Sequence, residues 1–191
     1  MKVQKIKNWL TLIIFFIAST NLFSEKSDTK NDFHFGFESE MMTFINNGYH
    51  GSFWAGQNGL RARLVVAKAT FPSSLTPAGF KNLTSYFYEC EIDYFFSKRK
   101  NEFRGIWFAL GFGYTLQEIE SIATNNKASV NLFDLHTGIG YVIQVYKGLY
   151  INPWIGLDLH LNAPKEVNVG SQIWRPRMFD PVLGIKLGYS F

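Results

Sequence analysis

The sequence predicts an all-β fold, an eight-stranded antiparallel up-and-down β-barrel that spans a membrane. The first observation is the last stretch, residues 182–191, in which Leu183, Ile185 and Leu187 alternate with Gly184 and Lys186. A strand turns successive side chains to opposite faces, so this alternation predicts a strand with one apolar face. The second observation is that the same alternation recurs along residues 33–191. The third is that 47% of the residues are hydrophobic while the mean hydropathy is only −0.04, so apolar and polar residues are interleaved.

The membrane part of this prediction follows from the hydrogen bonds of the backbone. No window beyond the N-terminal region approaches the ~18 apolar residues that a transmembrane helix needs. Only helices and closed barrels satisfy all their backbone groups in lipid. A membrane protein with this pattern is therefore expected to be a barrel.

The N-terminal region predicts export. Residues 1–24 have a basic start, an apolar run at 9–18 and a small, polar end, which is typical of a cleavable signal peptide. An uncleaved anchor helix is the alternative, but the apolar run is too short for it. Residues 25–32 are expected to be a flexible lead-in, and residues 33–191 the barrel.

Charge and cysteine content exclude several classes of function. Lys2, Lys5 and Lys7 lie in the leader, so 16 of the 19 basic residues remain against 15 acidic ones, and the mature chain is near +1. No nucleic-acid partner is expected. Cys90 is the only cysteine, which excludes an intramolecular disulfide, a multi-cysteine metal site and a lipid-anchoring cysteine after the leader.

Eight segments show the alternation: 33–42, 49–56, 60–70, 83–96, 103–117, 129–145, 149–162 and 182–191. Asn58-Gly59 predicts a tight hairpin, because a type I′ turn needs positive φ at both central residues. This turn divides residues 33–70 into three strands instead of two, and the even total returns both termini to the periplasmic side. Pro153 lacks an N–H group, so we expect a bulge or a local irregularity there.

The connections between these strands alternate in length, as in bacterial barrels, which have short periplasmic turns and longer outer loops. The short ones are 57–59, 97–102 and 146–148. The longer ones are 43–48, 71–82, 118–128 and 163–178.

The two faces of the strands decide between two kinds of barrel. In a soluble, lipocalin-like barrel the apolar face would point inward and the charged face outward. Aromatic residues near the strand ends favour the membrane barrel, whose interfaces carry aromatic girdles. These residues are Tyr94, Phe96, Tyr189 and Phe191 at the periplasmic ends, and Tyr49, Phe71, Tyr86 and Phe179 at the outer ends.

The closing segment, which ends in Tyr189-Ser-Phe191, resembles the C-terminal strand of bacterial outer-membrane barrels. With the alternation over 33–191, the chain resembles small eight-stranded outer-membrane barrels of the OmpA and OmpX class. The resemblance implies an integral outer-membrane location, contact with outer-membrane lipid and lipopolysaccharide, and recognition by the assembly machinery through the strand ending at Phe191. A monomer is expected.

The inward face predicts a salt-bridge network that fills the lumen, because unpaired charges in a narrow interior are costly. Its expected members are Glu38, Glu40, Arg61, Arg63, Glu89, Glu91, Asp93 and Lys186. Lys186 is expected to face the lumen and to meet Glu38 or Glu40 on the first strand.

A second inward group lies on residues 129–162. If Tyr146 pairs with Tyr150, His136 lies opposite His160, and Asp134 and Asp158 are close by. Two histidines and two carboxylates are able to bind a divalent metal or to transfer protons. A polar cluster without a metal, a cofactor or a catalytic residue is nevertheless the main prediction, since polar side chains are expected in any such lumen.

Three residues of the longest loop, Trp174, Arg175 and Arg177, form a candidate contact for lipopolysaccharide phosphates, which arginine binds well. A solvated loop with an aromatic anchor is the alternative.

The function expected from these observations is non-enzymatic, with a plugged lumen, in envelope integrity or in surface and lipopolysaccharide interaction. A narrow channel for small or hydrophobic solutes is the first alternative. An outer-leaflet lipid-modifying enzyme is the second. No lipid-facing His/Ser pair is apparent, and His50, Ser52, Ser129 and Asp134 are brought together by no family motif.

Overall fold

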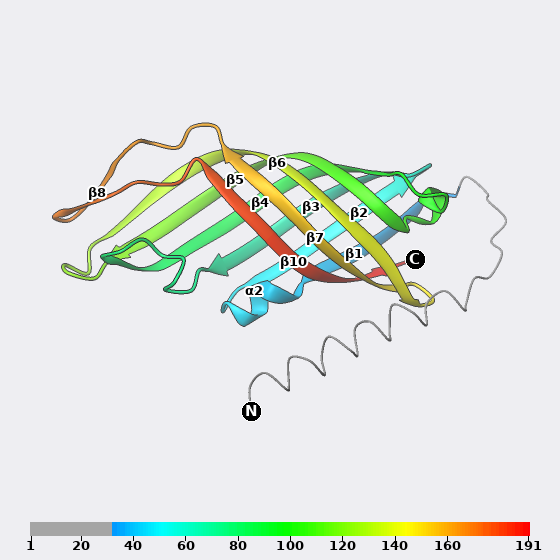
Figure 1. Ribbon diagram of the computed structural model, residues 1–191, viewed down its shortest axis with the longest axis horizontal. Coiled ribbons are helices and arrows are strands. Elements are labelled where there is room, and N and C mark those ends of the chain that lie inside the picture. Colours follow the sequence, from blue (N-terminus) through cyan, green and yellow to red (C-terminus); the bar gives the residue numbers. More distant parts are fainter. Residues whose placement is uncertain (1–31) are drawn as a thin grey trace, which may run out of the picture.

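The computed structural model describes residues 32–191 (Figure 1). The predicted signal peptide and nearly all of the lead-in lie outside the described residues. Among residues 32–191, no helix is both long and apolar enough to cross a membrane.

Eight antiparallel strands close into one barrel, which confirms the predicted eight-stranded antiparallel β-barrel. Each barrel strand pairs with the next one along the chain, and the last pairs with the first. The barrel strands are β1 (His34–Glu40), β2 (Tyr49–Gln57), β3 (Leu60–Thr70), β4 (Phe80–Phe95), β5 (Gly105–Ser121), β6 (Lys127–Tyr146), β7 (Leu149–His160) and β10 (Phe179–Ser190).

The barrel has two unlike ends. At the short-turn end, residues 58–59, 96–104 and 147–148 connect the strands, and the C-terminus lies there too (Figure 1). The segment 96–104 contains the short 3-10 helix η2 (Lys100–Glu102). At the long-loop end, β4, β5 and β6 extend farther than β1, β2 and β3, and the hairpin of β8 (Val167–Val169) and β9 (Gln172–Trp174) lies there.

Two predicted segments differ from the structure. The first predicted strand ends at Glu40, and Met41–Ile45 forms the helix α2, because the Glu40 side chain caps it by accepting a hydrogen bond from the Met42 N–H (3.3 Å). The predicted loop 163–178 contains the β8–β9 hairpin. This hairpin forms because Val169 and Trp174 are buried against Phe80 and Ile119.

Two local predictions concern the Asn58-Gly59 turn and Pro153. Asn58 (φ 56°) and Gly59 (φ 81°) both have positive φ, as the type I′ prediction requires. At Pro153 the ladder with β6 is interrupted, which is the predicted local irregularity, but no bulge forms. Pairing resumes with Ile151 opposite Ile143 in the register that Trp154 and Gly140 share. The shift between β6 and β7 lies instead at Gln144/Tyr146, beside the tight turn.

The β1–β10 seam closes the barrel, running from the pair Gly36–Ser190 to the pair Glu40–Lys186. Above it, β10 continues to Phe179 alongside β7. Pro181 lies in this upper part of β10, where it offers no N–H group for pairing with another chain.

Candidate functional site in the barrel lumen

The inward face carries the charged residues and the outward face the large apolar ones. Arg61, Arg63 and Lys186 are each 1% exposed, whereas Leu64 is 60% and Leu183 71% exposed. The alternation of each strand therefore turns its polar residues toward the barrel axis.

Two arginines of β3 bind the carboxylates of the lower lumen, by which we mean the half of the barrel interior nearer the short-turn end. The half nearer the long-loop end is the upper lumen. Arg61 contacts Glu38 (Nη1–Oε1, 2.8 Å) and Asp93 (Nε–Oδ2, 2.6 Å). Arg63 contacts Glu38 (3.1 Å), Glu91 (2.6 Å) and Asp93 (2.9 Å). We call these five residues the arginine network. It suits arginine, whose planar fork bonds several carboxylate oxygens at once.

Aromatic side chains fill the lumen around this network. Arg61 lies over the rings of Trp54 (5.1 Å) and Phe95 (5.2 Å). Phe103, which has a left-handed backbone (φ 54°), packs against both rings from the short-turn end. Tyr150 accepts a hydrogen bond from Trp54 (2.8 Å) and donates one to Glu38 (2.9 Å), and Trp107 donates to Asn152 (2.8 Å).

Three residues predicted for the salt-bridge network make other contacts. Lys186 faces the lumen beside Glu40, but its Nζ lies over the Trp154 ring (4.2 Å) and is in no ion pair within 4.0 Å among residues 32–191. Glu40 accepts hydrogen bonds from Trp154 Nε1 (2.6 Å) and from the Ile185 N–H (2.8 Å). It therefore links β1 to β7 and β10 at the end of the β1–β10 seam nearer the long loops. Its carboxylate reaches β10 because Gly184 has no side chain in its way.

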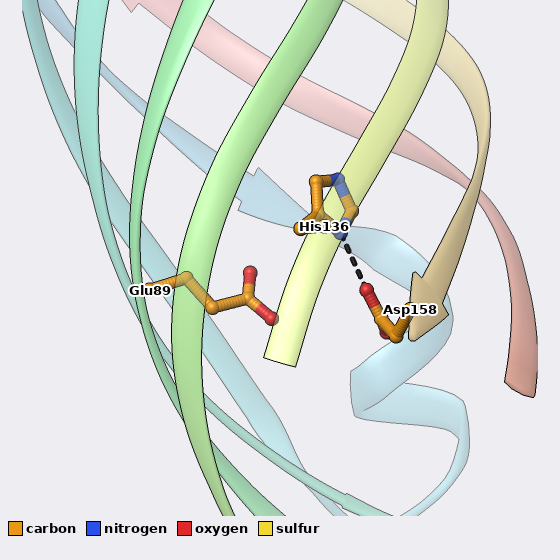
Figure 2. A group of neighbouring side chains, drawn as sticks. All are labelled: Glu89, His136 and Asp158. Carbon is orange, nitrogen blue, oxygen red and sulfur yellow. Dashed lines mark hydrogen bonds and ion pairs between the residues drawn. The ribbon is translucent and has the colours of Figure 1, made fainter. Parts of the chain in front are cut away.

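Glu89, the third of these residues, belongs to the upper lumen. Its carboxylate points toward the pair formed by His136 and Asp158 (Figure 2). We call Glu89, His136 and Asp158 the His136 cluster. One ligand atom from each lies within 4.8 Å of the others.

The two upper histidines do not face each other, which corrects the predicted register. Asp134 pairs with His160 and His136 with Asp158, because Tyr146 pairs with Leu149 at the tight turn and the register shifts beside it. His136 Nδ1 is 2.6 Å from Asp158 Oδ1, and His160 Nδ1 is 2.5 Å from Asp134 Oδ1.

The surroundings of the second ring nitrogen distinguish the two histidines. His160 Nε2 lies 3.1 Å from Asp180 Oδ2, and Thr115 donates to the other oxygen of Asp134 (2.5 Å). We call Thr115, Asp134, His160 and Asp180 the His160 cluster. His136 Nε2 is buried without a hydrogen-bond partner, and Glu91 Oε2 is 3.7 Å away.

The predicted loop contact is wrong for one of its residues. Trp174 is 2% exposed because it packs inside the β8–β9 hairpin against Phe80 and Ile119. Arg175 is exposed and bonded to Glu166 (2.7 Å), and Arg177 is exposed.

The residues considered for a lipid-modifying site have separate partners. His50 Nδ1 accepts from the Glu40 N–H (3.2 Å), and Ser52 donates to the Glu38 carbonyl (3.4 Å). Ser129 lies opposite Glu118 on the upper wall, and Asp134 belongs to the His160 cluster.

Several lumen residues were not singled out as site residues from the sequence: Trp54, Trp107, Thr115, Tyr150, Asn152, Trp154 and Asp180. All of them except Asp180 lie at the inward positions that the alternation predicts. Asp180 precedes the predicted start of the last strand, and β10 begins earlier, at Phe179.

Comparisons with known proteins support the fold. No protein-family model and no curated protein matches the sequence. Among solved structures, the barrel is similar to a major outer membrane protein from Thermus thermophilus (TM-score 0.54, 13% identity, 84% of this chain and 100% of that one). It is also similar to the N-terminal β-barrel domain of Pseudomonas aeruginosa OprF (TM-score 0.52, 12% identity, 86% and 100%). Neisserial surface protein A matches with a TM-score of 0.49 and 11% identity, over 83% of this chain and 97% of that one. The chain therefore has the fold of small eight-stranded outer-membrane barrels.

Proposed function

We propose that this protein is an integral outer-membrane barrel with a plugged lumen, which acts without catalysis in envelope integrity or at the cell surface. The observation that carries the proposal is the inverted polarity of the barrel. Its charged residues are buried inside, and large apolar side chains cover the outside.

The outer wall supports residence in a membrane. Phe112 is 66% exposed and Leu183 71% exposed, on nearly opposite sides of the barrel. A monomeric soluble protein rarely exposes apolar patches larger than a few hundred Å², and lipid removes this cost. Aromatic pairs near the short-turn end, Tyr94 with Phe96 and Tyr189 with Phe191, suit the interface with the headgroups.

A gel experiment tests the membrane assignment. We expect protein refolded from urea into detergent to migrate faster before boiling than after it, as a closed barrel that resists SDS does. Folded protein that remains soluble without detergent or lipid would contradict the proposal.

The arginine network and its aromatic neighbours support a plugged lumen rather than a channel. Trp54, Trp107, Arg61 and Arg63 fill the same cross-section, and each is at most 1% exposed. Eight strands enclose an interior that side chains are able to fill. Planar-bilayer recording is expected to give no steady conductance. A stable open level would favour the channel alternative.

The surface role rests on the long-loop end, where Arg175 and Arg177 are exposed beside the β8–β9 hairpin. We propose outer-membrane lipid and lipopolysaccharide as their surroundings, and assembly of a monomer through the strand ending at Phe191. Mass spectrometry of lipid A from cells with and without the protein separates this role from an enzyme. An altered lipid A profile would overturn the non-enzymatic assignment.

A further inference from the structure

We propose that the His136 cluster is a binding site for a divalent first-row transition-metal ion, with Glu89, His136 and Asp158 as its ligands. The three side chains come from β4, β6 and β7 and converge inside the upper lumen (Figure 2). This site is additional to the structural role of the barrel.

The spacing of the ligand atoms fits one ion. The three atoms lie within 4.8 Å of one another. Tetrahedral ligands at about 2.1 Å from zinc lie about 3.4 Å apart. A shift of about 1.5 Å in the longest of the three side chains, Glu89, would therefore complete the site.

The unpartnered nitrogen of His136 is the second observation. The residue is 2% exposed, and its Nε2 has no hydrogen-bond partner. Nδ1 faces Asp158 (2.6 Å) and is therefore the nitrogen that would bind the ion, which leaves Nε2 for an outer partner. Glu91 Oε2, 3.7 Å from Nε2, is placed as the outer carboxylate that a metal-bound histidine normally engages through its other nitrogen.

The charge of the upper lumen favours a cation. In the lower lumen, Glu38, Glu91 and Asp93 are each ion-paired with Arg61 or Arg63. The upper lumen holds four more carboxylates: Glu89, Asp134, Asp158 and Asp180. Among residues 32–191, none of the four forms an ion pair with an arginine or a lysine.

Glycines open the space that the cluster uses. Gly111 and Gly113 of β5 lie between β4 and β6, and a Cβ atom at Gly113 would come within 2.9 Å of Glu89 Cγ. A Cβ atom at Gly138 would come within 3.2 Å of His136 Nε2. These missing side chains let the carboxylates of β4 reach across β5 to the imidazole of β6.

The donor set determines the class of metal. One imidazole and two carboxylates suit ions such as Zn²⁺, Mn²⁺ and Fe²⁺, whereas Mg²⁺ and Ca²⁺ prefer oxygen ligands alone. Glu89 is the partly exposed member of the cluster, and His136 and Asp158 are buried.

Zn²⁺ titration of the detergent-folded, chelator-treated protein tests the site by calorimetry. We expect one bound Zn²⁺ per chain and at least about tenfold weaker binding in His136→Gln. Loss of a residue that only hydrogen-bonds a metal ligand already weakens metal affinity by about tenfold or more. The matched control is His160→Gln, which changes a histidine of the same two-strand hairpin whose nitrogens both contact carboxylates. This control is expected to bind Zn²⁺ like the wild type.

Folding of each variant is verified by heat-modifiable migration. If His136→Gln does not fold, Glu89→Gln replaces it, since Glu89 is partly exposed and is in no ion pair within 4.0 Å in the described chain. X-ray absorption of the Zn²⁺ form is expected to show one imidazole with oxygen ligands. Unchanged binding in the folded cluster variant, or equal loss in His160→Gln, would overturn the proposal.

Discussion

The two histidines of the upper lumen, His136 and His160, occupy equivalent positions in the β6–β7 ladder but have different surroundings. Each lies opposite an aspartate across the β6–β7 ladder, and each contacts that aspartate through Nδ1. Nε2 of His160 meets Asp180 of β10, whereas Nε2 of His136 has no hydrogen-bond partner. The two histidines differ because β10 supplies a carboxylate, Asp180, to the second ring nitrogen of His160 and supplies none to that of His136. His160 therefore has a hydrogen-bond partner at each ring nitrogen, whereas His136 has one at Nδ1 alone.

The arginine network of the lower lumen differs from both histidine clusters, because each of its carboxylates is ion-paired with an arginine. Arg63→Ala would leave Glu91 without its arginine and weaken the contacts of Glu38 and Asp93. Removing one partner of a buried ion pair costs about 3–5 kcal/mol, so we expect the largest loss of unfolding free energy here. Urea unfolding in detergent measures it. Arg63→Lys, which keeps the charge and loses the fork, should lie between this variant and the wild type.

His160→Gln is expected to cost more stability than His136→Gln in the presence of a chelator. The first change removes hydrogen bonds to two carboxylates, and the second removes a hydrogen bond to one. A hydrogen bond to a charged group contributes about 1.5–3 kcal/mol, so the two variants should differ by roughly one such bond. Equal losses of unfolding free energy would mean that the two histidines are equivalent.

Thr115→Val tests the outer support of the His160 cluster. The change removes the hydroxyl that donates to Asp134 Oδ2 and keeps the side-chain volume. We expect a loss of about 1.5–3 kcal/mol, typical of a bond to a carboxylate. Zn²⁺ affinity should be unchanged, because Thr115 does not contact the His136 cluster.

Arg175→Ala should have the smallest effect. Its contact with Glu166 is exposed, with side chains that are 73% and 51% accessible. Such pairs contribute well under about 1 kcal/mol. The unfolding midpoint should remain within error of the wild type, and a large loss would show that the β8–β9 hairpin depends on this pair.

The sequence was sufficient to predict most of the barrel. The alternation and the Asn58-Gly59 turn predicted the eight barrel strands and the inward face, including Lys186. The capping of α2 by Glu40 and the β8–β9 hairpin were missed, because both depend on contacts with distant residues. Trp174 illustrates the second case: an aromatic residue in a polar loop gives no sign of whether it is buried.

The sequence by itself determined which face of each strand is polar, and only the tertiary structure decided which polar residues meet. Side chains alternate with a period of two, so a slip of two residues between neighbouring strands leaves both faces unchanged. His136 opposite His160 and His136 opposite Asp158 differ by such a slip, and both agree with the same alternation. The tight turn after Tyr146 selected the second pairing, and barrel closure then brought Glu89 to His136 and Asp180 to His160.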